Sequence, residues 1–343
     1  MRITHQMLSR NYLKRMNTNL SNLTKSNDKM SSQRAFNKAY ENLADAGKAL
    51  KIRKLIADDE RQLTAVRDAQ GRAKAAEDGI RNVNSLMIGA KDRLVEGLNG
   101  TMSPEDRQKI ASELGKLQEE IFQIMNGQFS DKYLYNSAGN EDGSAPFTIG
   151  GAGELLYNGS PVDGLVKDPA TGKPATVENG VYTPIPWNAD NYVDIGAGFM
   201  LTGDKRVDAN TAFRDTFSGV ESFGYGTNAD GVPLNAYSLF GNMVKHLQAD
   251  NIEALEKDLN AIPDSMEFLL TSITEVGARY TVLEDTADRL ESEYINLVDT
   301  QNRLEGIDLS REIIYNKDFE MSWLVTLQLG SKILPQTIFD FLK

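Results

Sequence analysis

Two stretches of the chain repeat apolar residues at alternating steps of three and four positions. One runs from Met266 to Leu304 without a proline, about 39 residues or roughly 58 Å of helix. The other uses small and branched residues between Val66 and Leu94. A 3-4 repeat is the seam of a coiled coil and must pack against partner helices. The pattern therefore predicts a long helical rod.

Both ends of the chain carry shorter repeats. At the N-terminal end the seam positions are Leu13, Met16, Leu20, Leu23, Asn27 and Met30. Residues 31–44 lack a clear period and predict a break. At the C-terminal end Asp308 is placed to cap a last helix, whose apolar face holds Ile313, Ile314, Met321, Leu324 and Leu327. Nothing in the rod pattern covers this face, so we expect it to form an assembly interface together with Leu13, Met16, Leu20 and Leu23.

Local signals divide the rest of the helical sequence. Asn99-Gly100 ends the second seam, and Ser103-Pro104 begins another helix with Ser103 as its N-cap. Asp250-Asn251 begins a short helix, and Pro263 is expected to separate that helix from the long rod.

Between about residues 130 and 235 the period changes. Short apolar runs alternate with turn dipeptides such as Asp142-Gly143, Asn158-Gly159 and Asp230-Gly231. This pattern predicts short strands and hairpins. Because rod-like sequence resumes afterwards, we interpret this stretch as an insertion that contributes little to the rod seams.

The chain therefore predicts an α+β multidomain fold: a long antiparallel α-helical coiled-coil rod built from both chain ends, with an inserted small β-rich domain. Residues 1–42 and 306–343 would form an inner domain of terminal helices, largely disordered in the monomer. Residues 43–140 and 236–305 would form the rod, and residues 141–235 the outer domain.

Charge and composition narrow the functional classes. The net charge of −12 argues against nucleic-acid binding. The chain has no apolar run long enough for a signal peptide or a membrane span, so no membrane partner is expected. Residues 1–40 are basic, which leaves a transit peptide as an alternative interpretation. Cysteine is absent, which excludes disulfides and fits export of an unfolded chain.

Candidate chemistry is sparse. His5 and His246 have no Cys or acidic neighbour at metal-ligand spacing. Gly150–Gly153 lacks the lysine of a phosphate-binding loop. A glycosidase-like pair of Asp194 with Asp204 or Asp208 stays open, but nothing singles it out. We expect no enzyme, and no catalytic, cofactor or metal site.

Several motifs, taken in order, resemble the flagellin superfamily of bacterial flagella, and within it the hook–filament junction proteins. They are Met1-Arg2-Ile3-Thr4, Lys132–Gly139, Glu275–Tyr280 with Leu283-Glu284, and Ser331–Pro335 with Ile338–Leu342. Leu43 stands where that family usually has a proline. The resemblance covers both termini and both rod segments, roughly two thirds of the chain.

The resemblance implies a structural protein of the flagellum that is secreted by type III export. It implies assembly as a ring of identical subunits between the other hook-associated junction protein and flagellin. An export chaperone would cover the C-terminal helix beforehand. A filament flagellin is the alternative, and an enzyme active through the β insert is a weaker one.

Overall fold

The computed structural model describes residues 2–136, 143–151, 153–178, 180–185, 192–195, 198, 200, 207–208 and 212–333. The chain divides into two compact units. We call Met1–Glu60 with Glu291–Lys343 the terminal unit, and Arg61–Leu290 the central unit. Two long helices, α2 (Leu43–Gly97) and α6 (Ile252–Glu305), contribute to both. The predicted division into inner, rod and outer layers stays a prediction.

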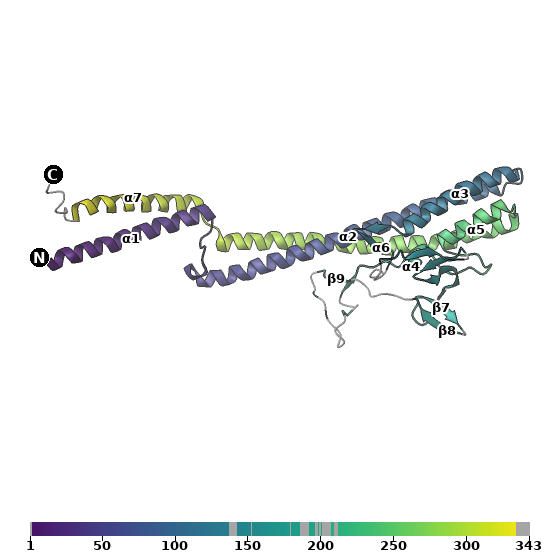
Figure 1. Ribbon diagram of the computed structural model, residues 1–343, viewed down its shortest axis with the longest axis horizontal. Helices are drawn as coiled ribbons and strands as arrows, with labels where there is room; N and C mark the ends of the chain where they lie inside the picture. Colours follow the sequence, from purple (N-terminus) through teal and green to yellow (C-terminus); the bar gives the residue numbers. More distant parts are fainter. Residues whose placement is uncertain are drawn as a thin grey trace. The chain divides into compact units, whose positions relative to one another are not determined.

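The terminal unit is built around two helices that lie side by side, α1 (Arg2–Ser32) and α7 (Leu309–Ile333) (Figure 1). A 3₁₀ turn, η1 (Ala39–Glu41), follows α1 and leads into α2. The predicted break after the first helix is confirmed, since α1 ends at Ser32. Asp308 caps α7 as predicted, accepting a hydrogen bond from the Arg311 N–H at 3.1 Å.

The central unit contains the second seam in the predicted form. Every seam residue of α2 from Val66 to Leu94 is at most 1% exposed. On α6, Leu269, Leu283 and Leu290 are buried to the same degree. The helix α3 (Pro104–Met125) begins as expected, because the Ser103 side chain accepts a hydrogen bond from the Asp106 N–H. The coiled-coil prediction is therefore confirmed.

Two helical boundaries differ from the sequence-based expectation. Pro263 lies inside α6 and does not separate two helices, so the 54 residues from Ile252 to Glu305 form one helix. Ala261, Ile262 and Ser265 are fully buried around the proline, and this packing offsets the lost backbone hydrogen bond. The helix α5 (Ala236–Gln248), which packs on α3, was not identified separately.

The insertion forms small antiparallel sheets, as predicted, gathered on one side of the central helices (Figure 1). A first hairpin joins β1 (Gln128–Phe129) to β2 (Lys132–Tyr133). One three-stranded sheet comprises β3 (Phe147–Ile149), β4 (Leu155–Tyr157) and β5 (Ser160–Pro161). Another comprises β6 (Val166–Lys167), β7 (Pro174–Glu178) and β8 (Val181–Pro184). The last pair is β9 (Tyr192–Val193) with β10 (Phe213–Arg214), and the short helices are η2 (Val162–Gly164) and α4 (Gly219–Phe223).

The insertion shares its core with the helices, so the expectation that it contributes little to the rod is wrong. Phe147, Tyr157 and Phe223 are at most 1% exposed and belong to the same buried cluster as the α2 seam. The Tyr135 hydroxyl donates a hydrogen bond to the Ala76 carbonyl of α2 at 2.7 Å. An added Cβ at Gly79 would lie 2.3 Å from that hydroxyl. The close approach therefore needs a glycine on α2.

Candidate assembly surface on the terminal helices

The contact between α1 and α7 is lined by polar side chains. Asn19 Nδ2 donates to Thr326 Oγ1 at 2.7 Å, and the Ser26 hydroxyl donates to Glu312 Oε1 at 2.8 Å. Asn316 Nδ2 donates to Asn27 Oδ1, also at 2.8 Å. Because residue numbers rise along α1 as they fall along α7, the two helices run antiparallel. Hydrogen bonds of this kind fix register but contribute little net stability.

A close contact completes this seam near the far end of the pair. Tyr12 is buried, and a Cβ added to Gly330 would lie only 2.0 Å from the Tyr12 hydroxyl. Any larger residue at position 330 would push the two helices apart. Glycine thus sets the approach of α7 to α1 at this point.

The predicted N-terminal seam is wrong at every second position, where the residue between the helices is the one just before the predicted residue. Leu13, Leu20 and Asn27 are exposed, and Tyr12, Asn19 and Ser26 take their places between the helices. Met16 and Leu23 are half-buried, as is Met30. Two of the five apolar seam residues, Leu13 and Leu20, therefore lie on the outside of the pair, and sequence periodicity alone cannot distinguish such positions from a core.

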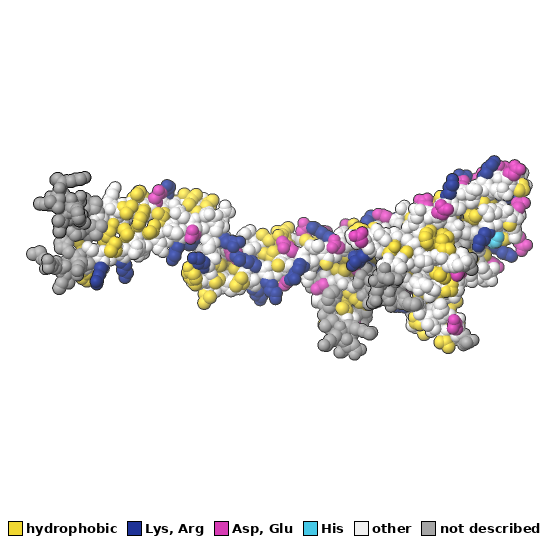
Figure 2. Space-filling model, viewed as in Figure 1, with side chains coloured by type: hydrophobic (Ala, Val, Ile, Leu, Met, Phe, Trp, Pro, Cys, Tyr) yellow, Lys and Arg dark blue, Asp and Glu magenta, His cyan; other side chains and the backbone are white. Residues whose placement is uncertain are grey.

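The predicted C-terminal residues lie on the outside as well. Ile313, Ile314, Met321, Leu324 and Leu327 are between 44 and 65% exposed, and Leu13 and Leu20 are 45 and 43% exposed. Figure 2 shows hydrophobic side chains spread along the surface of this helix pair. Contiguous exposed apolar surface of this extent is typical of protein–protein interfaces. The helix pair can therefore offer apolar surface to partners, while its own contact combines polar side chains with Tyr12, Met16 and Leu23.

One buried carboxylate, Glu305 at the end of α6, contacts both the segment that follows α1 and the helix α2. The Glu305 side chain is 5% exposed and accepts a hydrogen bond from Arg53 Nη2 at 2.7 Å, with Arg34 at 3.9 Å. The Ala35 N–H donates to the Glu305 carbonyl at 2.7 Å. Burial raises the pKa of Glu305, but the Arg53 hydrogen bond and charge outweigh it and leave that pKa below its ordinary value.

The residues considered for chemistry are dispersed. Asp194 accepts hydrogen bonds from Gln62 Nε2 and the Gly198 N–H, and the side chain of His5 and all of Asp204 lie outside the described residues. His246 Nδ1 lies 2.6 Å from Oδ2 of the buried Asp258 across the turn between α5 and α6. Sequence reasoning missed this pair because its partners are twelve residues apart. The His246–Asp258 contact links α5 to α6 across the turn that joins them.

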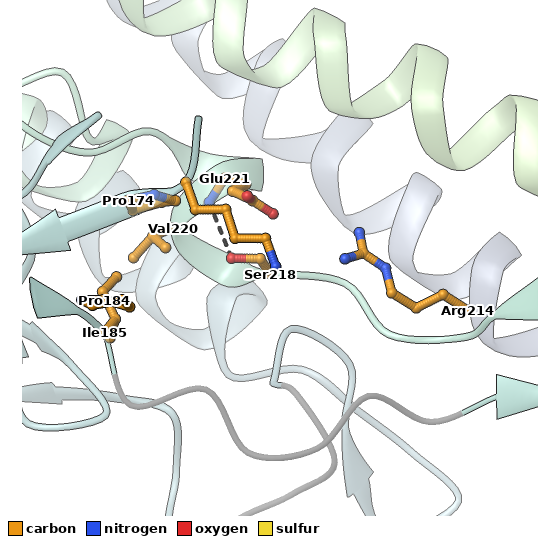
Figure 3. Close-up of a pocket in the computed structure, with 8 residues that line it drawn as sticks. Pro174, Pro184, Ile185, Arg214, Ser218, Val220 and Glu221 are labelled. Atoms are coloured by element: carbon orange, nitrogen blue, oxygen red, sulfur yellow. Dashed lines mark hydrogen bonds between the residues drawn. The ribbon is translucent and has the colours of Figure 1, made fainter. Parts of the chain in front are cut away.

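A small pocket on the insertion is the strongest place for bound chemistry. Figure 3 shows Arg214 and Glu221 pointing toward one another beside Val220, Pro184 and Ile185. Burial raises the pKa of Glu221, against the opposing effect of Arg214. Within the described part of the chain, neither Asp194 nor Asp208 lines this pocket. One carboxyl beside one arginine does not form a general acid–base pair.

Among the described residues, no helix is both long and apolar enough to cross a membrane. The same residues contain no group of three His, Cys, Asp or Glu side chains arranged to hold a metal ion.

The N-terminal part of the chain is similar to flagellins. Residues 3–139 match the model for the bacterial flagellin N-terminal helical region, a stretch that contains α1, α2 and α3. This match covers 137 of the 343 residues of the chain. A flagellin of Clostridium tyrobutyricum is 28% identical over 36% of this chain, a match that spans only 33% of that relative. A flagellin of Bacillus subtilis (strain 168) is 22% identical over 91% of this chain and 90% of its own length.

The fold of the chain also matches a solved structure. A protein described as a flagellar hook-associated protein of Vibrio parahaemolyticus superposes with a TM-score of 0.57 over 78% of this chain and all of the other, at 14% identity. At that identity the likeness establishes the fold. Bacillus cereus FlgL covers 74% of the chain at 17% identity, with a TM-score of 0.49.

Proposed function

We propose that this chain is a structural protein of the bacterial flagellum that joins hook to filament. After type III export, identical subunits would assemble into a ring through their terminal helices. The observation that carries this proposal is that α1 and α7 make polar contacts with one another while many of their apolar residues, among them Leu13, Ile314 and Leu324, are exposed. Such a helix pair is suited to burying its outer face against other subunits.

The partners follow from the same surface. A ring of identical chains needs a heterologous contact, in which one face of a subunit meets a different face of the next. On either side of the ring the exposed residues of α1 and α7 would meet the other hook-associated junction protein and flagellin. Before export, a flagellar chaperone would cover Ile313, Ile314, Met321, Leu324 and Leu327.

A filament flagellin is the second candidate. The Bacillus subtilis flagellin that aligns with 91% of this chain favours it. The two roles differ in self-assembly. A filament subunit polymerises alone into long filaments, whereas a junction subunit stops at a limited ring.

An enzymatic role has less support. The described pocket is lined by one arginine, Arg214, and one carboxyl, Glu221, and the relatives of this chain are flagellins. We therefore propose a non-enzymatic protein.

The test uses a strain that lacks the gene and carries an epitope-tagged copy of the full chain. Immunogold labelling is expected at one site per flagellum, between hook and filament, and the deletion strain should release flagellin into the medium. Purified subunits should remain short oligomers at concentrations where flagellin forms filaments. Labelling along the whole filament would identify the chain as a flagellin and overturn the junction role.

A further inference from the structure

A second apolar surface lies at the start of α2. Tyr40, Leu43 and Leu50 are 74, 79 and 62% exposed, among the largest values for apolar side chains of the described chain. Leu43 and Leu50 are seven residues apart, so they lie on one face of the helix. A different face of α2 is already used, because Ala46 and Ala49 are buried with Phe36. Figure 2 shows hydrophobic and basic side chains gathered over this part of α2.

A glycine separates the two leucines. Gly47 is helical, and an added Cβ would have nothing within 4 Å. Glycine in a helix interior lowers the stability of the helix relative to alanine. No contact within the chain requires a glycine at position 47. A missing side chain between two exposed leucines leaves a notch into which a side chain of another helix can pack.

Charge distinguishes this surface from the central unit. Lys51 and Lys54 are exposed beside the leucines. Residues 1–60 contain 12 Lys and Arg against 6 Asp and Glu, whereas residues 61–290 contain 20 against 34. Residues 252–290 of α6 contain 3 basic and 9 acidic residues. Opposite charges on two parts of one chain favour head-to-tail association of copies.

The acidic segment carries an apolar residue of its own. Leu270 is 51% exposed, and Glu267 lies one turn before it on the same face of α6. Asp285 is exposed further along, eighteen residues after Glu267 and close to the same face. An acidic face around an exposed leucine complements a basic face around two leucines and a notch.

We propose that Leu43, Gly47, Leu50, Lys51 and Lys54 form a second subunit interface, which binds the face of α6 from Glu267 to Asp285 in another copy of the chain. The inference rests on the proposed function, since it describes how subunits of the assembly meet. It adds a contact that does not involve α1 or α7. It also explains why the most exposed leucine of the described chain occurs outside the terminal helices.

The first experiment is a charge exchange in the full chain. The double change Lys51→Glu and Lys54→Glu should reduce the number of filaments per cell at least tenfold. Adding Glu267→Lys and Asp285→Lys should restore most of them. Circular dichroism of the purified variants checks that each is folded. Filament numbers at the wild-type level in the double variant, or a defect that the added lysines do not correct, would overturn the proposal.

The second experiment exploits the absence of cysteine. Leu50→Cys and Leu270→Cys in one chain should yield disulfide-linked ladders from isolated flagella, and Leu50→Cys with Ile88→Cys, a comparably exposed position, should not. Cross-links within one chain only, or no cross-link in flagella with normal filaments, would contradict the interface. Failure of the junction role is detected separately, because unmodified tagged protein would then be missing from the junction.

Discussion

Two helix pairs of this protein differ in the kind of side chain that lies between their helices. Between α2 and α6 in the central unit, Val66, Ile80 and Leu283 are completely buried, and the outer faces are charged. Between α1 and α7 in the terminal unit, asparagine, serine and threonine meet across the contact while leucines and isoleucines face outward. The first pair is built like the interior of a stable domain.

The difference shows where each pair obtains its stability. Burying apolar surface yields about 25 cal/mol per Å², and the central pair realises this within one chain. The terminal pair gains roughly 0.5–1.5 kcal/mol from each polar contact, and it can bury its apolar faces only against other molecules. We therefore expect the terminal unit to depend on assembly for burial of its outer apolar residues, and the central unit to be stable without assembly.

The largest expected effect is loss of assembly without loss of folding. Leu324→Asp puts a charge on the outer face of α7, where the side chain is 52% exposed. The free energy of unfolding should change by less than about 0.5 kcal/mol. In an assembled interface the same charge would be buried without a partner, at a cost of several kcal/mol. Chaperone binding and junction formation should both fail, so that cells carry hooks and shed flagellin.

Leu324→Met is the matched control, because it keeps an apolar side chain of similar size. Its cells should swim normally. Normal filaments in the Leu324→Asp strain would mean that α7 is not an assembly surface, and the contrast between the two helix pairs would lose its functional meaning.

A large effect on folding is expected where the insertion enters the central core. Phe223 is fully buried, with its ring centroid 4.6 Å from that of Tyr135 and 6.2 Å from that of Phe147. Phe223→Ala should lower the free energy of unfolding by about 3–5 kcal/mol. Urea unfolding followed by circular dichroism measures the change. Ile149→Ala, on an insertion residue that is 51% exposed, is the control and should change stability little. Equal stability of both variants would show that the insertion is separable from the rod.

Hydrophobic periodicity predicted the central unit well because its core is apolar. The seam from Val66 to Leu94 and the Ser103 cap depend on local sequence, and both were predicted correctly. The same signal is only partly correct for α1, where Leu13 and Leu20 face solvent while Asn19 and Ser26 make the contacts with α7. A pattern of Leu13, Met16 and Leu20 describes an apolar face without saying what covers it.

Tertiary packing accounts for the other differences. Pro263 is a strong local signal for a break, but buried neighbours on both sides hold α6 continuous through it. The aromatic residues of the insertion gave no sign that they join the helical core. The contact of Tyr135 with Ala76 links positions 59 residues apart, which periodicity cannot detect.

A moderate gain in stability should follow from making the polar seam apolar. Asn316 is 9% exposed and donates to the exposed Asn27. Asn316→Leu removes that bond but leaves Asn27 accessible to water, and it buries a leucine between the helices. We expect the helix pair to gain about 1 kcal/mol while its register becomes less fixed. Slower amide exchange across α1 and α7 would report the gain. Lys317→Leu controls for helix propensity at an exposed neighbouring position, and an equal gain there would remove the seam from the explanation.

The smallest expected effect is a loss of stability of the terminal unit at low pH, through protonation of Glu305. Since the pKa of Glu305 is lowered in the folded chain from the ordinary value of 4.5, the carboxylate stabilises the terminal unit above that value. This contribution is lost as pH falls through the lowered pKa, because protonation weakens the contact with Arg53. As Arg53 is 40% exposed, we expect a loss of no more than about 1 kcal/mol. Amide exchange of α7 should be measured between pH 6 and pH 3, which lie about 1.5 units above and below the ordinary pKa of a glutamate. Exchange should accelerate on acidification by more than its intrinsic pH dependence predicts. Glu305→Gln, which cannot titrate, should remove the additional acceleration. An identical pH profile in both proteins would assign the acid sensitivity to other carboxylates of the terminal unit.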